Sequence, residues 1–234
     1  MLAILKRELL SYFTSPLGYV FVAVFYLFSG VFLYLFTLSN QTADMSSVYI
    51  GMFFVMLIMI PILTMRLMAE ENKQKTDQLL LTSPVSLPRL VMGKFLSAFT
   101  ILTVCMLIFL VYGIVLGFFT TVNWLIILGN IAGMLLLGGV CISAGLFIST
   151  LTENQMIAAV GAIGLNIGLL LIDSFASVMP TEFLKNVMGS LSVYTRYNEF
   201  TIGIFSFSNV FFFVSVSFVF VFLTVRVLEK RRWA

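Results

Sequence analysis

The sequence predicts an all-α polytopic membrane protein with six transmembrane helices. Of its 234 residues, 61% are hydrophobic and only 10% are charged, whereas a soluble domain carries about 25% charged residues. The apolar residues form long continuous runs that do not alternate with polar ones, which favours helices over the strands of a membrane barrel. Lipid must solvate much of the chain, because one water-soluble core could not enclose so many apolar side chains.

Six apolar runs approach the length of about 20 residues that a bilayer requires. They are Leu17–Leu38, Val48–Met65, Phe95–Phe119, Trp124–Ile148, Met156–Ile172 and Val210–Val225. The second and fifth runs are short, so their ends are the least well defined. The chain, residues 1–234, is predicted to be a single transmembrane domain.

Residues 1–15 are predicted to form an amphipathic helix that lies in the membrane interface. Apolar side chains recur there at spacings of three or four: Leu2, Leu5, Leu9, Tyr12 and Phe13. Pro16 then breaks the helix before the first span. The alternative is that these residues begin the first span early.

The distribution of basic residues predicts the orientation. Eleven of the 13 Lys and Arg residues lie in the amino-terminal segment, in residues 66–94 and in the carboxyl-terminal tail. With six spans these three regions share one side of the membrane, and only Lys185 and Arg196 lie on the other. Because basic residues are enriched on the cytoplasmic side, both termini and residues 66–94 are predicted to be cytoplasmic.

Residues 66–94 form one dense charged stretch, predicted to be a cytoplasmic coupling loop between the second and third spans. The stretch holds five of the 13 basic residues and three of the 10 acidic ones. Pro84 and Pro88 punctuate it, which leaves a short helix over roughly Ala69–Leu81. Leu79 and Leu80 are unsuited to free solvent, so they seat in a cleft of a soluble partner or fold back on the membrane.

The two adjacent glutamates of this helix are expected to have different roles. Neighbouring residues point about 100° apart on a helix, so one glutamate can face a partner while the other stays with its own helix. The spacing predicts ion pairs from Arg66 to Glu70 and from Glu71 to Lys75.

The long connection at residues 173–209 is predicted to be an extracytoplasmic segment. Aromatic side chains are interleaved there with charged ones, including Tyr194, Arg196 and Glu199. This pattern predicts a half-inserted or interfacial helix pair that caps the outer mouth, or else an ordinary aromatic belt. Three Gly-x-x-x-Gly motifs, beginning at Gly113, Gly129 and Gly164, predict close helix packing within one subunit or between two.

Several function classes are excluded by composition. The chain has no His, which removes Ser-His-Asp catalysis, Cys-His catalysis and the usual zinc sites. Glu70-Glu71 followed by Lys75 resembles a motif of membrane proteases, but those enzymes need an Arg there and additional His groups. The two cysteines, Cys105 and Cys141, lie within apolar runs and are expected to be packed as small hydrophobic residues.

The charge pattern excludes further classes. The net charge is only +3 and the basic residues lie beside the spans, so no nucleic-acid partner is expected. No charged residue lies in the middle of a predicted span, whereas ion pumps and proton-coupled carriers place charges there. The energy source is therefore expected to lie outside this chain.

Three parts of the sequence resemble the membrane subunits of ABC type-2 exporters. The first combines Arg66, Ala69-Glu70-Glu71, Thr76-Asp77-Gln78-Leu79-Leu80, Ser83-Pro84-Val85-Ser86 and Gly93-Lys94. The second runs from Gly145 to Ala159 and the third from Leu191 to Gly203. The matches run across most of the chain and look most similar to the gliding-motility permeases, with the nitrous-oxide-reductase maturation permeases next. Lys75 departs from the Gly that the family usually has, and Gln78 from its Glu.

The resemblance implies the partners and the site residues. It implies a six-span subunit of the bacterial cytoplasmic membrane that forms a homodimer or pseudodimer and binds two cytoplasmic ATPases. The residues implied to dock the ATPase are Arg66, Glu70, Glu71, Thr76, Asp77, Leu79 and Leu80. Glu153 and Asn154, between the fourth and fifth spans, are implied to make a second cytoplasmic contact.

ATP chemistry is expected on the partner and not on this chain. The sequence has no Gly-x-x-x-x-Gly-Lys-Ser/Thr phosphate loop, so ATP and Mg²⁺ are expected on the ATPase, and this chain is expected to bind no cofactor or metal. The leading hypothesis is thus a non-enzymatic permease subunit of an ATP-driven exporter. The alternative is a mechanotransmission subunit, which would pass ATPase closure to an extracytoplasmic auxiliary subunit without moving a solute. A passive channel is disfavoured because no span shows a polar stripe.

The predicted orientation can be tested by cysteine labelling in intact cells. Cysteines introduced at Ser46 and Thr181 should react with an impermeant thiol reagent, because both positions are predicted to lie outside. A cysteine at Lys73 should react only after the membrane is permeabilised. Labelling of Lys73→Cys from outside in intact cells would contradict the orientation.

Overall fold

The computed structural model describes the chain except for residues 1, 43, 76–85, 179–188, 190 and 234. The described residues form helices and no strands, and six of the helical segments are long and apolar enough to cross a membrane. The predicted all-α fold with six spans is confirmed. The helices in order are α1 (Leu2–Thr14), α2 (Pro16–Phe32), the π-helical η1 (Leu33–Leu38), α3 (Ser46–Thr64), α4 (Arg66–Lys73), α6 (Leu87–Gly117), α7 (Trp124–Leu151), α8 (Gln155–Val178), α10 (Val193–Thr201) and α11 (Phe207–Trp233).

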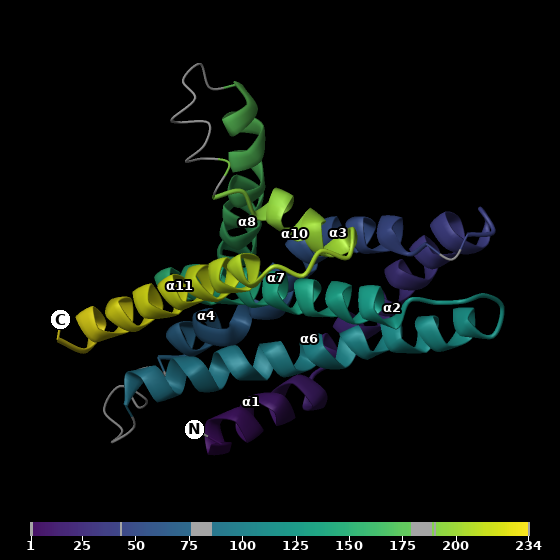
Figure 1. The fold of residues 1–234 in the computed structure, drawn as a ribbon. Coiled ribbons are helices and arrows are strands. Elements are labelled where there is room, and N and C mark those ends of the chain that lie inside the picture. Colours follow the sequence, from purple (N-terminus) through teal and green to yellow (C-terminus); the bar gives the residue numbers. More distant parts are fainter. Residues whose placement is uncertain (1, 43, 76–85, 179–188, 190, 234) are drawn as a thin grey trace.

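The central helix of the fold is α7, which packs against α3, α4, α6, α8, α10 and α11. The spans through α3 and α7 are the most enclosed, with 61% and 56% of their most apolar stretches buried, whereas the span of α11 is only 17% buried. In Figure 1, α6, α7 and α11 run in a common direction while α8 projects out of this bundle. The outer helices α2, α8 and α11 therefore keep large apolar surfaces for lipid or another subunit.

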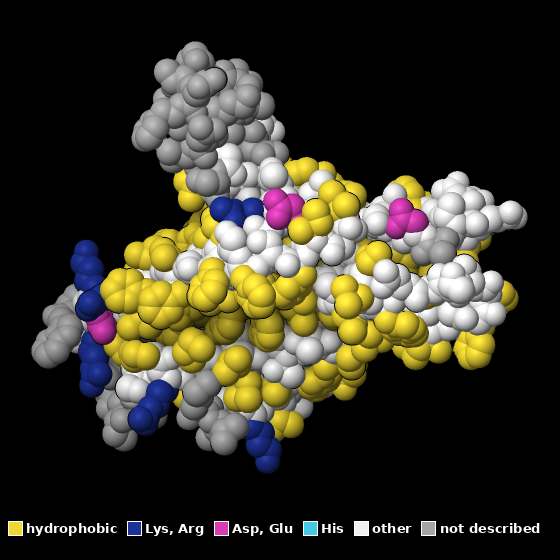
Figure 2. Space-filling model, in the orientation of Figure 1, with side chains coloured by type: hydrophobic (Ala, Val, Ile, Leu, Met, Phe, Trp, Pro, Cys, Tyr) yellow, Lys and Arg dark blue, Asp and Glu magenta, His cyan; other side chains and the backbone are white. Residues whose placement is uncertain are grey.

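The bundle has two chemically different ends. One end, which we call the basic end, holds α1, α4, the start of α6 and the carboxyl terminus of α11 (Figure 1). Lys and Arg side chains gather at this end, while hydrophobic side chains dominate the middle of the visible face (Figure 2). The other end, which we call the opposite end, holds the connections from η1 to α3 and from α6 to α7.

The helices extend past the predicted spans at the basic end. The second span was predicted to end at Met65, but α4 continues from there to Lys73, and α6 begins at Leu87 and not at Phe95. Hydropathy identifies only the apolar part of such a helix. The polar extensions of α4 and α6 are not apolar, but an ion pair between Glu71 and Lys94 joins them. The helix predicted over Ala69–Leu81 is wrong at its end: Lys75 lies in a turn with a left-handed φ of 56°. That conformation favours glycine, which is the usual residue at this position in the family that the chain resembles.

Two glycines outside the predicted motifs set how closely α7 approaches its neighbours. A Cβ at Gly145 would overlap Thr64 of α3, and one at Gly138 would overlap Leu102 of α6. Within the motifs, Gly133 fits against Phe200, whereas Gly164 and Gly168 of α8 have no described neighbour within 4 Å. The close packing inside the subunit thus runs along α7, and the α8 motif stays open.

A proline in the last turn of α3 leaves one carbonyl group to be satisfied by another helix. Pro61 has no N–H, so it cannot donate to the Leu57 carbonyl one turn earlier. Asn166 of α8 donates its amide Nδ2 to this carbonyl at 3.2 Å, and the side chain of Asn166 is 1% exposed. This bond replaces a lost helix bond and joins α8 to α3.

A double-mutant cycle tests this replacement. In the natural chain Asn166→Leu removes the donor to Leu57, whereas in a Pro61→Ala background the new N–H of residue 61 can take its place. We expect Asn166→Leu to cost about 1 kcal/mol more in the natural chain than in the Pro61→Ala background. Unfolding of the four proteins in mixed micelles of SDS measures the difference. Equal costs in both backgrounds would show that Asn166 does not substitute for the missing helix bond.

Candidate functional site

The joint between α3 and α4 is held by side chains from three other helices. The two helices meet at Met65, so backbone groups on either side of it need partners from elsewhere. Ser149 of α7 donates its hydroxyl to the Met65 carbonyl at 3.0 Å. The same oxygen accepts from the N–H groups of Met68 and Ala69 at 3.1 and 3.0 Å. One hydroxyl thereby caps the start of α4 and fixes it to the central helix.

Two further carbonyl groups at the joint accept from α1 and α6. The Tyr12 hydroxyl of α1 donates to the Leu63 carbonyl at 2.9 Å. Burial raises the pKa of Tyr12, so the hydroxyl keeps the proton that this bond requires. Lys94 of α6 donates its Nζ to the Leu67 carbonyl. Three helices thus contribute one capping side chain each.

Four charged side chains form a cluster beside the joint, and we call Arg7, Glu8, Glu71 and Lys94 the junction cluster. The Nζ of Lys94, which is 1% exposed, lies 2.9 Å from Glu71 Oε2 and 3.2 Å from Glu8 Oε1. The Nη2 of Arg7 lies 2.8 Å from Glu71 Oε1 and 2.7 Å from Glu8 Oε1. Two cations and two carboxylates balance here, and they join α1, α4 and α6.

The value of the junction cluster lies in fixing geometry more than in adding stability. Desolvation offsets most of the Coulomb attraction of a buried ion pair, but removing one member leaves an uncompensated charge. Lys94 has three N–H donors, and its contacts with Glu8, Glu71 and the Leu67 carbonyl match that number. A displacement of α4 relative to α1 or α6 would therefore break contacts that water cannot easily replace.

Arg66, at the start of α4, binds α1. Its Nη2 donates to the carbonyl and the hydroxyl of Ser11 at 3.0 Å each, its Nη1 donates to Ser15 Oγ at 2.9 Å, and its guanidinium lies 4.7 Å from the Tyr12 ring centre. The ion pair predicted from Arg66 to Glu70 is wrong, because these contacts turn the guanidinium away.

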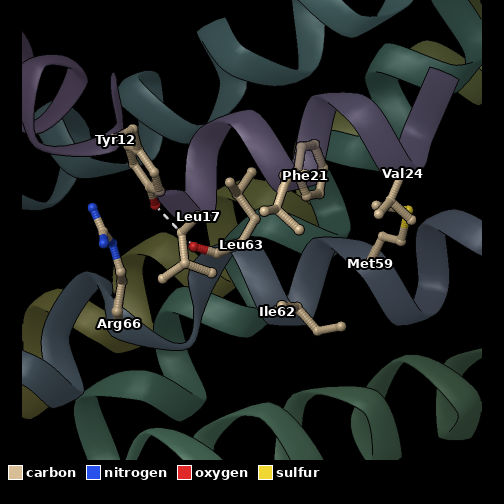
Figure 3. A pocket seen from close by; sticks show the side chains of 9 residues that line it. Tyr12, Leu17, Phe21, Val24, Met59, Ile62, Leu63 and Arg66 are labelled. Carbon is tan, nitrogen blue, oxygen red and sulfur yellow. Dashed lines mark hydrogen bonds between the residues drawn. The ribbon is translucent and has the colours of Figure 1, made fainter. Parts of the chain in front are cut away.

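Arg66 and Tyr12 also close one end of a pocket. Figure 3 shows both side chains beside an otherwise apolar space between α2 and α3. The remaining lining residues are Leu17, Val20, Phe21, Val24, Met59, Ile62 and Leu63.

The connection between α7 and α8 is fixed to α4 by an amide. Asn72 is buried, and its Nδ2 donates to the carbonyls of Thr150 and Thr152 at 3.4 and 3.3 Å. Asn154 then caps α8, since its Oδ1 accepts from the Met156 N–H at 2.9 Å. Glu153, between Thr152 and Asn154 in the sequence, is exposed. The α7–α8 connection therefore belongs to the same structural unit as α4.

The predicted docking residues are distributed between two sides of α4. Arg66 and Glu71 point towards α1 and α6, whereas Glu70 is partly exposed and accepts from the Gln74 amide at 3.4 Å. The other predicted docking residues lie outside the described residues: Thr76, Asp77, Leu79 and Leu80. No group of three or more His, Cys, Asp or Glu side chains in the described part of the chain could hold a metal ion.

The predicted extracytoplasmic residues lie on and around α10. Tyr197 is fully buried and donates its hydroxyl to the Tyr49 carbonyl at 3.1 Å, so α10 is inserted against α3. Tyr194 packs edge-on to Phe53 at 5.5 Å.

Two charged residues of α10 contact Asn209 of α11. Arg196 donates to Asn209 Oδ1 at 3.0 Å, and Asn209 donates to Glu199 Oε2 at 2.6 Å. These contacts join α10 to the start of α11, and the half-inserted or interfacial helix pair stays a prediction.

Several residues of the joint were not predicted as site residues. Glu8 lies one turn from both Leu5 and Tyr12, so it shares the apolar face of α1. A charged residue on an apolar face was the feature of the sequence that could have identified Glu8. Phe13, which was assigned to that face, is 43% exposed. Lys94 directly precedes the third apolar run, where a lysine can bury its stem while its ammonium finds a partner. Ser149 carried no signal, because a serine near the end of a span is common.

One family model matches most of the chain. The model for "ABC-2 family transporter protein" matches residues 33–228, which is more than half of the sequence. The chain belongs to the ABC-2 transporter family. A search of curated proteins finds no match.

Membership in the ABC-2 family makes this chain a permease subunit of an ABC transporter. Membrane domains of this family are typically non-catalytic and work with an ABC ATPase on a separate subunit. The chain is correspondingly a multi-pass membrane protein. The joint at α4 is therefore a candidate site for coupling to that ATPase.

The contribution of Lys94 can be measured directly. Lys94→Ala should destabilise the protein by about 3–5 kcal/mol, because Glu8 and Glu71 lose the buried cation that they share. Lys73→Ala, which removes an exposed lysine of α4, should change stability by no more than about 0.5 kcal/mol. Unfolding in SDS mixed micelles compares the two variants. A similar, small effect of both would mean that the junction cluster does not fix the helices.

Proposed function

We propose that this permease subunit couples ATP hydrolysis by a separate ABC ATPase to export across a bacterial cytoplasmic membrane. The observation that carries the proposal is that α4 is bonded to three other helices at once. Ser149 and Asn72 join it to α7, Lys94 joins it to α6, and Arg66 joins it to Ser11 of α1. Motion of an ATPase that binds α4 would therefore move several helices together.

The exposed side of α4 supports the same proposal. Leu67, Met68 and Ala69 are buried, whereas Lys73 and Gln74 are exposed and Glu70 is half-buried. The ATPase would contact this exposed side, and we place Thr76, Asp77, Leu79 and Leu80 in the same contact on the strength of the sequence resemblance. Glu153 and Asn154 would form the second contact, because Asn72 holds their connection beside α4. ATP and Mg²⁺ would be bound by the ATPase.

The basic end is proposed to be the cytoplasmic end. Eleven of the 13 basic residues belong to the three segments that are predicted to share one side of the membrane. Cytoplasmic loops are enriched in basic residues, so this side is proposed to be the cytoplasmic one. The visible face of the molecule has its Lys and Arg side chains concentrated there (Figure 2). The ATPase would then bind from the cytoplasm. A place within the gliding-motility group stays a prediction from the motif resemblance.

A second copy of the chain, or a homologous permease, is proposed to bind the open face of α8. Met156 and Val160 are 69% and 67% exposed there, and Gly164 and Gly168 continue the same face. Residues four apart share one side of a helix, so they form an apolar stripe with two small residues, suited to a closely packed helix.

One observation favours mechanotransmission as a second candidate function. On the opposite end α10 rests directly on α3, through Tyr197 and its ring contact with Phe53 at 4.9 Å. Because α3 leads into α4, a displacement of α4 would reach α10 and an extracytoplasmic auxiliary subunit bound there. Reconstituted complexes that hydrolyse ATP in the presence of that subunit, without moving lipid or solute, would favour this candidate.

The proposed docking is tested by co-expression of the chain with its separate ABC ATPase subunit, followed by co-purification. The wild-type complex should contain two copies of each subunit. The Leu79→Asp/Leu80→Asp variant should lose the ATPase, because each buried leucine contributes about 1.5–3 kcal/mol to an interface. Leu191→Asp introduces a leucine-to-aspartate change at an exposed leucine just before α10, and this variant should retain the ATPase. Normal ATPase yield and stimulated activity in the double variant would overturn the proposal.

A further inference from the structure

A polar pocket lies at the opposite end, remote from α4. It has a volume of about 300 Å³ and is formed by the start of α3, the connection after α6 and the start of α7. Its polar lining residues are Asp44, Ser46, Tyr49, Thr121, Asn123 and Asn130. The proposed ATPase coupling gives this pocket no role.

Two residues that line this pocket each carry a deeply buried polar atom with no partner among the described residues. These atoms are the Tyr49 hydroxyl and Asn130 Oδ1, on side chains of residues that are 1% and 0% exposed. The Asn130 Nδ2 donates to the Ile126 carbonyl at 2.9 Å, which fixes the other end of the amide as the oxygen. Buried polar groups are nearly always paired, so these two atoms point to a ligand, and Asn130 Oδ1, which can only accept, requires that the ligand supply a donor.

The remaining polar groups of the pocket also present oxygen atoms. Asp44 Oδ1 accepts from the Ser46 N–H at 2.8 Å and from the Ser46 hydroxyl at 2.6 Å, so the carboxylate is held in place. Asn123 Oδ1 accepts from the Leu125 N–H at 3.1 Å. No described lining residue is basic, and Asp44 gives the pocket a negative charge. A donor-rich cation fits this chemistry, whereas an anion does not.

We propose that this pocket binds a primary ammonium group, as carried by the headgroup of an ethanolamine phospholipid. An ammonium has three N–H donors and no acceptor, which suits Asn130 Oδ1, the Tyr49 oxygen and the Asp44 carboxylate together. Trp124 begins α7 beside the pocket, and tryptophan is enriched at the level of lipid headgroups. The same ammonium chemistry occurs in free ethanolamine, so the test separates the two sources.

Thermal unfolding of the purified full chain, with any subunits that co-purify, measures the binding. Dihexanoyl phosphatidylethanolamine should raise the melting temperature, and the phosphatidylcholine with the same chains should not, because its trimethylammonium has no N–H donor. An equal rise with free ethanolamine would assign the site to a soluble amine. A rise with phosphatidylethanolamine alone would assign it to the lipid. Equal shifts with phosphatidylethanolamine and phosphatidylcholine would overturn the proposal.

Four variants separate binding from folding. Asn130→Leu should weaken the apparent affinity at least about tenfold, because the buried acceptor is lost. Tyr49→Phe and Asp44→Asn should each reduce the lipid-induced shift, and they keep the test decisive if Asn130→Leu fails to fold. Tyr197→Phe is the matched control: it removes a tyrosine hydroxyl that donates to the Tyr49 carbonyl and should lower the melting temperature without reducing the shift. Undiminished shifts in Tyr49→Phe and Asp44→Asn would show that the pocket is not the site.

Discussion

A membrane helix that changes direction must find partners for the backbone groups that its last and first turns leave free. In this permease the break falls at Met65, and side chains from α1, α6 and α7 satisfy the exposed groups. The positions of those three helices around α4 depend on this requirement. A break in a helix is usually a weak point, yet here side chains from three helices bond to the groups beside it.

The charges at the joint follow the same logic. Lys94 can be almost fully buried only because Glu8, Glu71 and a carbonyl group together occupy its three donors. Glu8 comes from α1, so α1 completes the site. The two adjacent glutamates differ in their surroundings. Glu71 pairs with Lys94 and joins α4 to α6, whereas Glu70 is partly exposed on α4.

The six spans could be predicted because apolar runs of this length have few alternatives in lipid. The joint could not, since its bonds connect residues that lie far apart in the sequence, such as Glu8 and Lys94. Local spacing predicted the wrong partner for Arg66. An i,i+4 ion pair in an exposed helix contributes only about 0.3–0.5 kcal/mol, and Arg66 instead contacts Ser11, Ser15 and the Tyr12 ring. Family resemblance marked Arg66 and Lys94 as members of motifs, without their partners.

Contacts along α3 give a physical path between the two ends of the molecule. At the basic end α3 leads into the bonded joint, near its carboxyl end Asn166 repairs the bond that Pro61 lacks, and at the opposite end Tyr197 and Phe53 seat α10 on it. Pro61 removes one bond of the helix ladder, so bending concentrates there. Because the repairing amide belongs to α8, any bend of α3 must also displace α8, the helix whose other face is open to a second subunit. Coupling between α4 and a dimer interface on α8 would thus need no contact between them beyond α3 itself.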